Sequence, residues 1–195
     1  MWDERYSSPE YAFGTQPNDF LVSVASKIPQ GRVLCLGEGE GRNAVYLASL
    51  GYEVVAVDQS KIGLAKAQQF ATQQQVKIHT IAADLADFVI EPQSWQGIVS
   101  IFCHLPSPLW GRVHRSAVAG LARGGRLILE AYTPRQLQWK TGGPKNLDML
   151  VSLDVVRSEL ADLDFEVLQE VERNITEGIY HNGMSAVVQV LGKAN

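Results

Sequence analysis

The stretch that decides the fold is residues 33–48, VLCLGEGEGRNAVYLA. It begins inside a short apolar run, Arg32–Leu36, which predicts a buried strand. Three glycines in Gly37–Gly41 then predict a tight turn into a helix over Asn43–Leu50, which ends at Gly51. Glycine permits positive φ and lets a ligand approach the backbone closely. A tight turn also needs glycine for its geometry, so the loop by itself indicates no ligand.

The next strand strengthens the indication of a ligand site. Residues Glu53–Val57 are strand-like, and Asp58 follows them directly, 17 residues after Gly41. An acidic side chain at this strand end can accept hydrogen bonds from both hydroxyl groups of a ribose. The order of strand, glycine turn, helix, strand and acid therefore predicts a nucleoside-binding site.

Residues within the turn discriminate between nucleosides. The dinucleotide fingerprint G-x-G-x-x-G requires glycine where this chain has Arg42, and the Gly-Lys-Ser/Thr of a phosphate-binding loop is missing. Glu38 and Glu40 stand between the glycines, and two carboxylates repel a pyrophosphate. A ligand with a cationic end is not repelled. We therefore expect S-adenosylmethionine, which carries an ammonium and a sulfonium group.

Helix and strand patterns alternate along most of the chain. Before the glycine loop, Pro17 to Lys27 is helical in pattern. After it we expect a helix from Ser60 to about Gln74 and then strands over Val76–Ala82 and Gly97–Phe102. A helix from Ser107 to Leu121 follows, its end marked by Gly124-Gly125, and then a strand over Arg126–Ala131 and a Gly/Pro-rich loop over Thr133–Pro144. The chain ends with a helix from about Ser152 to Ala161 and strands over Phe165–Arg173 and Ala186–Leu191, which are joined by a hairpin link, Asn174–Gly183.

This alternation predicts the fold class. Strands that alternate with helices pair in parallel, because each crossover returns the chain to the same end of the sheet. The last two strands break the alternation, so one of them should run antiparallel. We expect a doubly wound α/β fold with a mostly parallel, seven-stranded sheet and one antiparallel strand near the edge. Ligands of such sheets bind beyond the carboxyl ends of the strands.

These motifs resemble those of class I S-adenosylmethionine-dependent methyltransferases, in particular small bacterial enzymes of the tellurite-resistance and thiopurine types. The likeness continues from residues 33–48 through Val57–Ser60, Ala83–Leu85, Phe102–Pro106 and Leu121–Glu130. It covers about residues 33–132 and is weaker at both ends. The resemblance implies methyl transfer with S-adenosylmethionine as the cofactor.

The resemblance also implies which residues bind that cofactor. Gly37 and Gly39 would line the methionine part, Asp58 would hold the ribose, Asp84 and its neighbour would flank the adenine, and Phe102 would form a wall under the sulfur. Asp84 has a second interpretation, as a cap of the turn that follows it. The implied cofactor set is Gly37, Glu38, Gly39, Asn43, Asp58, Gln59, Asp84, Leu85 and Phe102.

Two cysteines, Cys35 and Cys103, lie in apolar stretches. They are too few for a disulfide framework or a four-ligand zinc site, so we expect buried thiols, no metal and a cytoplasmic location. Many family members carry an acid where this chain has Cys35, and Glu38 is the candidate to supply that charge.

Residues after the later strands are the candidates for the acceptor site. Methyl transfer needs a general base only if the acceptor must lose a proton. His104 is a candidate base, or a side chain that hydrogen-bonds its loop. Arg135 either holds an anionic acceptor or is a surface charge. His181 lies on the predicted hairpin link, where polar residues indicate either substrate contact or an exposed tip.

Composition limits the partners. The 195 residues include 17 Lys and Arg against 21 Asp and Glu, for a net charge of −4, so non-specific nucleic-acid binding is not expected. The start of the chain, MWDER, does not resemble a signal peptide, and no apolar run is long enough to span a membrane. Residues 16–195 should form a single methyltransferase domain that acts on a small molecule. The sequence does not predict an oligomeric state.

The first 15 residues form a separate N-terminal arm in this interpretation. Four aromatic residues, Trp2, Tyr6, Tyr11 and Phe13, predict either a lid over the cofactor or a segment that packs on the sheet edge. Two other functions remain as alternatives to the methyltransferase. One is a catalytically silent regulator that binds S-adenosylmethionine, and the other is an NAD(P)-dependent oxidoreductase, which Arg42 and the acidic turn disfavour.

Overall fold

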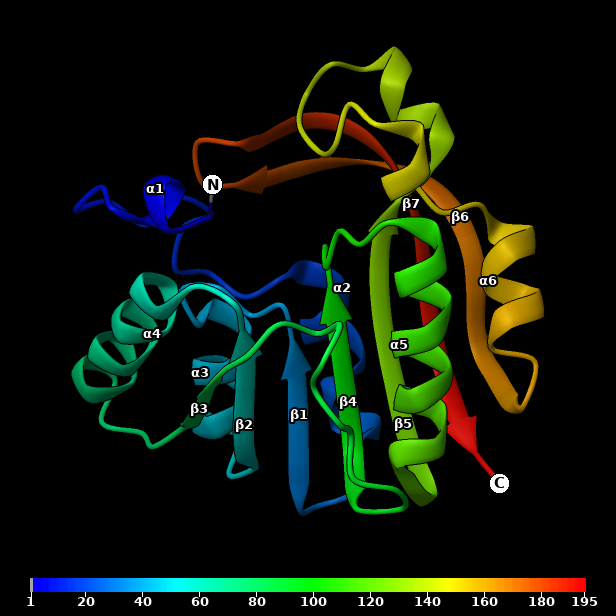
Figure 1. The fold of residues 1–195 in the computed structure, drawn as a ribbon, viewed down its shortest axis with the longest axis horizontal. Helices are drawn as coiled ribbons and strands as arrows, with labels where there is room; N and C mark the ends of the chain where they lie inside the picture. Colours follow the sequence, from blue (N-terminus) through cyan, green and yellow to red (C-terminus); the bar gives the residue numbers. More distant parts are fainter. Residues whose placement is uncertain (1) are drawn as a thin grey trace.

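The computed structural model describes residues 2–195 and centres on a seven-stranded sheet (Figure 1). Its strands are β1 (Arg32–Leu36), β2 (Glu53–Asp58), β3 (His79–Ala82), β4 (Trp95–Ile101), β5 (Leu121–Tyr132), β6 (Leu163–Glu177) and β7 (His181–Ala194). The order across the sheet is β3-β2-β1-β4-β5-β7-β6. Strand order therefore reverses between β1 and β4, which is where doubly wound sheets bind their ligands.

Strand directions confirm the predicted fold class. Neighbouring strands from β3 to β5 run parallel, whereas β7 pairs antiparallel with both β5 and β6. The antiparallel strand is thus β7, one place in from the edge strand β6. The helices are α1 (Trp2–Tyr6), α2 (Asp19–Val24), α3 (Arg42–Ser49), α4 (Lys61–Gln73), α5 (Ser107–Gly120) and α6 (Leu153–Glu159), with 3-10 turns at Ala25–Lys27, Pro134–Gln138 and Leu147–Met149.

Side chains of β1 alternate between two apolar cores, one on each face of the sheet. Val33 and Cys35 belong to the core that contains residues of α2, α3 and α4, and Leu34 and Leu36 belong to the core under α5 and α6. Figure 1 shows α5 and α6 in front of the sheet and α2 and α3 behind it. Because both faces of β1 are covered, its sequence is apolar throughout rather than alternating.

One sequence-based boundary is wrong. Gly124-Gly125 was expected to mark the end of a helix, but α5 ends at Gly120 and β5 begins at the next residue. The two glycines lie within β5, where the pairing with β4 shifts register between Trp95 and Gly97. Gly124 has φ +76°, so the pair forms an irregularity of the strand, for which glycine is as suitable as it is for a helix end.

Several strands differ in length from their prediction, most clearly β3, β6 and β7. The third strand begins at His79 instead of Val76, because the Val76 N–H donates to the Ala71 carbonyl and keeps this segment on the end of α4. The final hairpin is longer than expected. Its pairing extends to Glu177 and His181, so most of the predicted link is strand. Polar side chains on the outer face of this hairpin conceal the strand pattern.

The N-terminal arm contains a short helix, α1, that was not predicted; Met1, the first residue of that arm, lies outside the described residues. In Figure 1 the arm lies under the far end of the β6–β7 hairpin. The Ile179 N–H of the hairpin donates to the Ala12 carbonyl over 3.1 Å. Among residues 2–195, none of the helices combines the length and apolar character needed to cross a bilayer.

Candidate functional site

A cavity of about 540 Å³ opens beyond the carboxyl ends of β1, β2 and β4. His104 and His181 line it, but Arg135 and Gly39 do not. The remaining predicted cofactor residues all contribute to its lining: Gly37, Glu38, Asn43, Asp58, Gln59, Asp84, Leu85 and Phe102. Residues predicted from separate motifs are therefore brought together around a single space.

The glycine loop packs closely against its surroundings. Gly37 and Gly39 both have φ +61°. A Cβ atom on Gly37 would lie 2.8 Å from the Cys103 Sγ, and one on Gly39 would lie 2.6 Å from the Tyr6 hydroxyl. Both the backbone angle and the lack of space therefore require glycine at these positions. Gly39 shapes the loop without lining the cavity itself.

Glu38 occupies the amino end of α3. Its Oε1 accepts the N–H groups of Asn43 at 3.0 Å and Ala44 at 2.8 Å. Loss of solvation raises the pKa of Glu38 to about 7, although these two hydrogen bonds act in the opposite direction. A helix amino end is where a dinucleotide places its pyrophosphate. Here that position is already taken by a carboxyl group of the chain.

Glu40 has a different role from Glu38. Its Oε2 accepts the Ala12 N–H at 2.8 Å, and its other oxygen forms an ion pair with Lys66. The charge of Glu40 is therefore balanced within the protein, and the residue fastens the N-terminal arm to the loop. The repulsion that we expected from two free carboxylates therefore does not apply to Glu40, and Glu38 disfavours a phosphate by occupying the helix amino end.

Asp58 is held in place by backbone groups. Its Oδ2 accepts the Gly39 N–H at 2.9 Å, and its Oδ1 accepts the Ser60 N–H at 2.8 Å. Burial raises the pKa of Asp58, and the hydrogen bonds from the backbone oppose that shift. Each carboxylate oxygen retains a further lone pair, so the group can still accept hydrogen bonds from a ligand.

Asp84 and Leu85 line the opposite part of the cavity. The Asp84 Oδ1 accepts the Ala86 N–H at 2.8 Å, so this side chain does cap the following turn. It also remains exposed at the cavity, which means that the two interpretations of Asp84 are compatible. Leu85 is buried in the second apolar core and offers a flat apolar contact.

Phe102 follows the last residue of β4 and has a strained backbone conformation. Its φ of +50° lies in the left-handed region, which is costly for an aromatic residue and often marks a functional site. The ring stacks on Tyr132 with centroids 4.6 Å apart and meets His181 edge-on at 5.0 Å. Phe102, Tyr132 and His181 therefore form an aromatic cluster, in which Phe102 and His181 line the cavity.

His104 lies beyond Phe102 and is largely enclosed. Its Nε2 is buried and has no hydrogen-bond partner in the described part of the chain. Burial, with smaller contributions from His181 and Arg5, lowers the pKa of His104 to about 3. The imidazole is therefore neutral at physiological pH, and no carboxylate is paired with it.

Arg135 does not take part in the cavity. It is exposed on the turn after β5 and forms ion pairs with Glu172 and Glu170 of β6. Arg135 is therefore a surface charge, which was the alternative to its role in holding an anionic acceptor.

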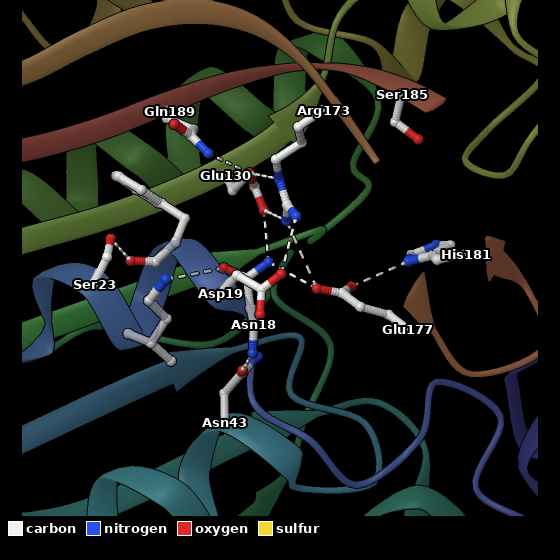
Figure 2. A network of polar contacts seen from close by, with 12 residues as sticks. Asn18, Asp19, Ser23, Asn43, Glu130, Arg173, Glu177, His181, Ser185 and Gln189 are labelled. Atoms are coloured by element: carbon white, nitrogen blue, oxygen red, sulfur yellow. Dashed lines mark hydrogen bonds and ion pairs between the residues drawn. The ribbon is translucent and has the colours of Figure 1, made fainter. Parts of the chain in front are cut away.

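A buried polar network links the hairpin to the sheet, and no local sequence pattern predicts it. Arg173 donates to both carboxylate oxygens of Glu130, at 2.8 and 2.7 Å. Asn18 bridges two carboxylates, donating to Glu130 at 2.6 Å and to Glu177 at 2.9 Å. Figure 2 shows how this network continues from Glu177 towards His181.

Arg42 completes the network from α3. Its guanidinium donates to the Glu177 Oε2 at 2.7 Å, and both side chains are less than one-tenth exposed. Although burial opposes ionisation, contacts with His181, Arg42 and Asn18 lower the pKa of Glu177 to about 2. The carboxylate beside His181 is therefore charged throughout the physiological range.

The N-terminal arm and the hairpin tip form the roof of the cavity. Arg5 lies over the Tyr180 ring, 4.8 Å from its centroid, and Phe13 packs beside the same ring with centroids 5.8 Å apart. All three residues line the cavity. Segments from opposite ends of the sequence therefore cover the same space.

Part of this chain is similar in sequence to known proteins. Residues 33–125, just under half of the chain, match the model of a methyltransferase domain family. A segment of 82 residues is 33% identical to a probable S-adenosyl-L-methionine-dependent methyltransferase, TehB, of Haemophilus influenzae. Over this part of the chain, the sequence is therefore similar to S-adenosylmethionine-dependent methyltransferases. The segment aligned with TehB makes up 42% of this chain and spans 28% of the relative's length.

Solved structures show the same fold in other proteins. The crystal structure of Haemophilus influenzae TehB matches this chain over 100% of its length and 66% of the TehB chain, with a TM-score of 0.75 at 19% identity. A structure concerned with conversion of a disulfide bond into a thioacetal group during echinomycin biosynthesis gives 0.77 at 17% identity, over 99% of this chain and 89% of that one. Magnesium protoporphyrin IX methyltransferase of Synechocystis PCC 6803, with bound S-adenosylmethionine, gives 0.65 at 16% identity, over 90% and 75%.

Proposed function

We propose that this protein transfers the methyl group of S-adenosylmethionine to a small-molecule acceptor by in-line displacement. The observation that carries the proposal is the position of Glu38, whose carboxyl group closes the amino end of α3 beside the cavity. That arrangement disfavours a pyrophosphate and leaves a cationic amino-acid ligand as the natural occupant. The match of residues 33–125 to a methyltransferase domain model supports this choice.

We assign the cofactor-binding roles as follows. Asp58 accepts hydrogen bonds from the ribose, because its carboxylate is fixed at the end of β2 with lone pairs to spare. Asp84 and Leu85 flank the adenine. Gly37 and Phe102 border the methionine end. Glu38 and Asn43 lie beside Gly37, and Gln59 lies beside Asp58, so all three complete the lining of the cofactor half.

The chain contributes alignment and exclusion of water. S-adenosylmethionine supplies an electrophilic methyl group whose sulfonium charge disperses as the acceptor approaches. A dry, correctly shaped cavity favours that dispersal. The aromatic wall of Phe102 and the roof of Arg5, Phe13 and Tyr180 provide such an enclosure. We therefore propose that residues 1–15 act as a lid rather than as packing alone.

We further propose that the protein acts on a small-molecule acceptor in the cytoplasm. Its acidic balance disfavours a nucleic-acid substrate, and its two buried free thiols suit a reducing compartment. We propose residues 16–195 as one catalytic domain.

Calorimetry and turnover test the proposal together. We expect S-adenosylmethionine and its demethylated product to bind, and NAD not to bind. Turnover is then assayed with a panel of thiols, thiopurines, tellurite and selenite. Binding without turnover of any acceptor would favour a silent regulator. Preferential binding of NAD would refute the methyltransferase assignment for this chain.

A further inference from the structure

Two histidines border the acceptor end of the cavity, but their surroundings differ. His104 and His181 lie with ring centroids 6.4 Å apart, and both contact Phe102 and Tyr132. Within residues 2–195, His104 forms no ion pair with a carboxylate, and none contributes to its pKa shift. His181 has the Glu177 carboxylate 3.6 Å from its Nδ1. Only His181 therefore has a partner that stabilises a positive charge on the ring.

The network in Figure 2 fixes the carboxylate of this pair. Glu177 receives hydrogen bonds from Arg42 at 2.7 Å and from Asn18 at 2.9 Å. The Nδ1 of His181 is itself buried and has no other polar partner within residues 2–195. A neutral imidazole in this position carries its proton on Nδ1, towards Glu177, and leaves the lone pair on Nε2. Because Nδ1 is the buried nitrogen and His181 lines the cavity, we take Nε2 as the nitrogen available to an acceptor.

We propose that His181, oriented by Glu177, is the general base that removes a proton from the methyl acceptor. The inference rests on the proposed methyltransferase function and specifies its substrate class. The acceptor is uncharged and carries a weakly acidic proton on its nucleophile, as a thiol does, rather than being an oxyanion that needs no base.

The reaction balances as follows. The acceptor S–H bond breaks, and its proton moves to the Nε2 of His181. The sulfur lone pair forms the new S–CH₃ bond, while the electrons of the bond between methyl and sulfonium return to the cofactor sulfur as a neutral thioether. The imidazolium that forms is paired with the Glu177 carboxylate and releases its proton to water when the site opens.

The surroundings of His181 also limit which protons it can remove. Burial lowers its pKa, Arg42 and Arg5 lower it further, and Glu177 opposes them. The other titratable neighbours are His104 of the loop after β4 and Tyr132 of β5. A base of reduced strength can deprotonate a thiol, with an ordinary pKa of about 8.5, much more easily than an alcohol.

Two thiols of similar size test this role. Benzyl mercaptan is mostly protonated at neutral pH, whereas 4-nitrothiophenol is ionised. We expect His181→Gln to lower methylation of benzyl mercaptan about 100-fold and to change methylation of 4-nitrothiophenol by no more than about threefold. The matched control is His79→Gln, at an exposed histidine in β3. Equal losses on both thiols, or no loss on benzyl mercaptan, would overturn the base role.

The pairing of Glu177 with His181 is tested by a measurement other than turnover. We expect NMR titration of the His181 imidazole to give a lower pKa in Glu177→Gln than in the wild type, because the carboxylate stabilises the charged ring. Glu172→Gln, on the same strand but paired with Arg135 outside the cavity, should leave that pKa in place. An unchanged His181 pKa in Glu177→Gln would overturn the pairing.

Calorimetry separates this inference from the function on which it rests. If the wild type binds S-adenosylmethionine but methylates neither thiol, the base inference fails while cofactor binding stands. If the wild type does not bind S-adenosylmethionine, the proposed function itself fails. Binding by His181→Gln with wild-type affinity, together with the selective loss on benzyl mercaptan, supports both.

Discussion

Asp58 and Gly39 are joined by a 2.9 Å hydrogen bond from the glycine N–H to the carboxylate. The bond connects the end of β2 to the loop after β1, so the two motifs predicted from sequence form one rigid unit. A ligand that contacts Asp58 therefore meets a loop that is already in position. This pre-organisation lowers the ordering cost of binding.

The first prediction concerns Asp58→Ala. We expect at least a tenfold loss of affinity for S-adenosylmethionine, about 1.4 kcal/mol, because charged hydrogen bonds to the ribose disappear and the loop loses its anchor. Isothermal calorimetry measures the change. Asp87→Ala, at an exposed acid outside the cavity, is the matched control and should bind normally. Wild-type affinity in Asp58→Ala would exclude the ribose role.

A second prediction concerns the pH dependence of stability that arises from Glu38. Its pKa is raised from 4.5 to about 7 in the folded state. The folded protein therefore holds this proton more tightly, and the resulting stabilisation is complete below pH 4.5 and lost as the pH rises through 7. Between pH 4.5 and 8, this effect of Glu38 should lower the free energy of unfolding of the wild type by up to about 3 kcal/mol, and Glu38→Gln should not show that decrease.

Urea denaturation at both pH values measures the free energy of unfolding. Glu53→Gln, at an exposed glutamate of β2, is the control and should keep the wild-type pH dependence. If Glu38→Gln shows the same decline as the wild type, the carboxyl group is not protonated at the helix end.

A third prediction compares two glycines with positive φ. Gly37→Ala places a Cβ atom 2.8 Å from the Cys103 Sγ, whereas Gly51→Ala, with φ +89°, meets nothing within 4 Å. Both variants carry the backbone cost of about 1 kcal/mol, and only the first adds a clash of about 1–3 kcal/mol. Thermal and urea unfolding should therefore show a larger loss for Gly37→Ala. Equal losses of stability in the two variants would mean that the glycine loop shifts freely enough to relieve the clash in Gly37→Ala.

A fourth prediction contrasts a buried and an exposed ion pair. Arg173→Gln removes the partner of Glu130, which is fully buried, and should lower the free energy of unfolding by about 3–5 kcal/mol. Arg135→Gln breaks an exposed pair and should cost less than about 1 kcal/mol. The second variant should also keep normal turnover, since Arg135 lies outside the cavity. Reduced turnover in Arg135→Gln would instead indicate that Arg135 takes part in the acceptor site.

A fifth prediction addresses the N-terminal arm. Deletion of residues 1–11 removes Arg5 from the roof and Tyr6 from its packing against the glycine loop. If the arm is a lid, turnover at saturating S-adenosylmethionine should fall by about tenfold or more, because water enters the cavity. The melting temperature reports any loss of folding separately. A fall in stability that accounts for the whole loss of activity would assign the arm to packing.

The glycine loop and Asp58 could be predicted because their signal is local. A strand, a turn and an acid follow one another within a few tens of residues, and the hydrophobic pattern places each of them in the sheet. The mostly parallel sheet and the antiparallel strand near its edge also followed from the alternation of elements. Gly124 was misplaced because glycine serves a helix end and a strand irregularity equally well.

The acceptor end was less predictable because its contacts are non-local. Arg135 and His181 both lie in polar segments whose sequence is typical of loops. Only the pairing of the strands distinguishes the positions that the two residues take in the fold. Arg135 turns towards β6, whereas His181 opens β7 above the cavity. Glu177 and Asn18, 159 positions apart, meet in the folded chain without any shared motif. Sequence patterning could not reveal a pair of this kind.

The register of the final hairpin has an evolutionary consequence. Glu177 and His181 are the last paired residues before the turn, and side chains along a strand alternate between its two faces. Insertion of a single amino acid into either arm of the hairpin would rotate the imidazole away from its carboxylate. Related enzymes that keep this chemistry should therefore tolerate length changes there only as even steps or at the tip, Gly178–Tyr180.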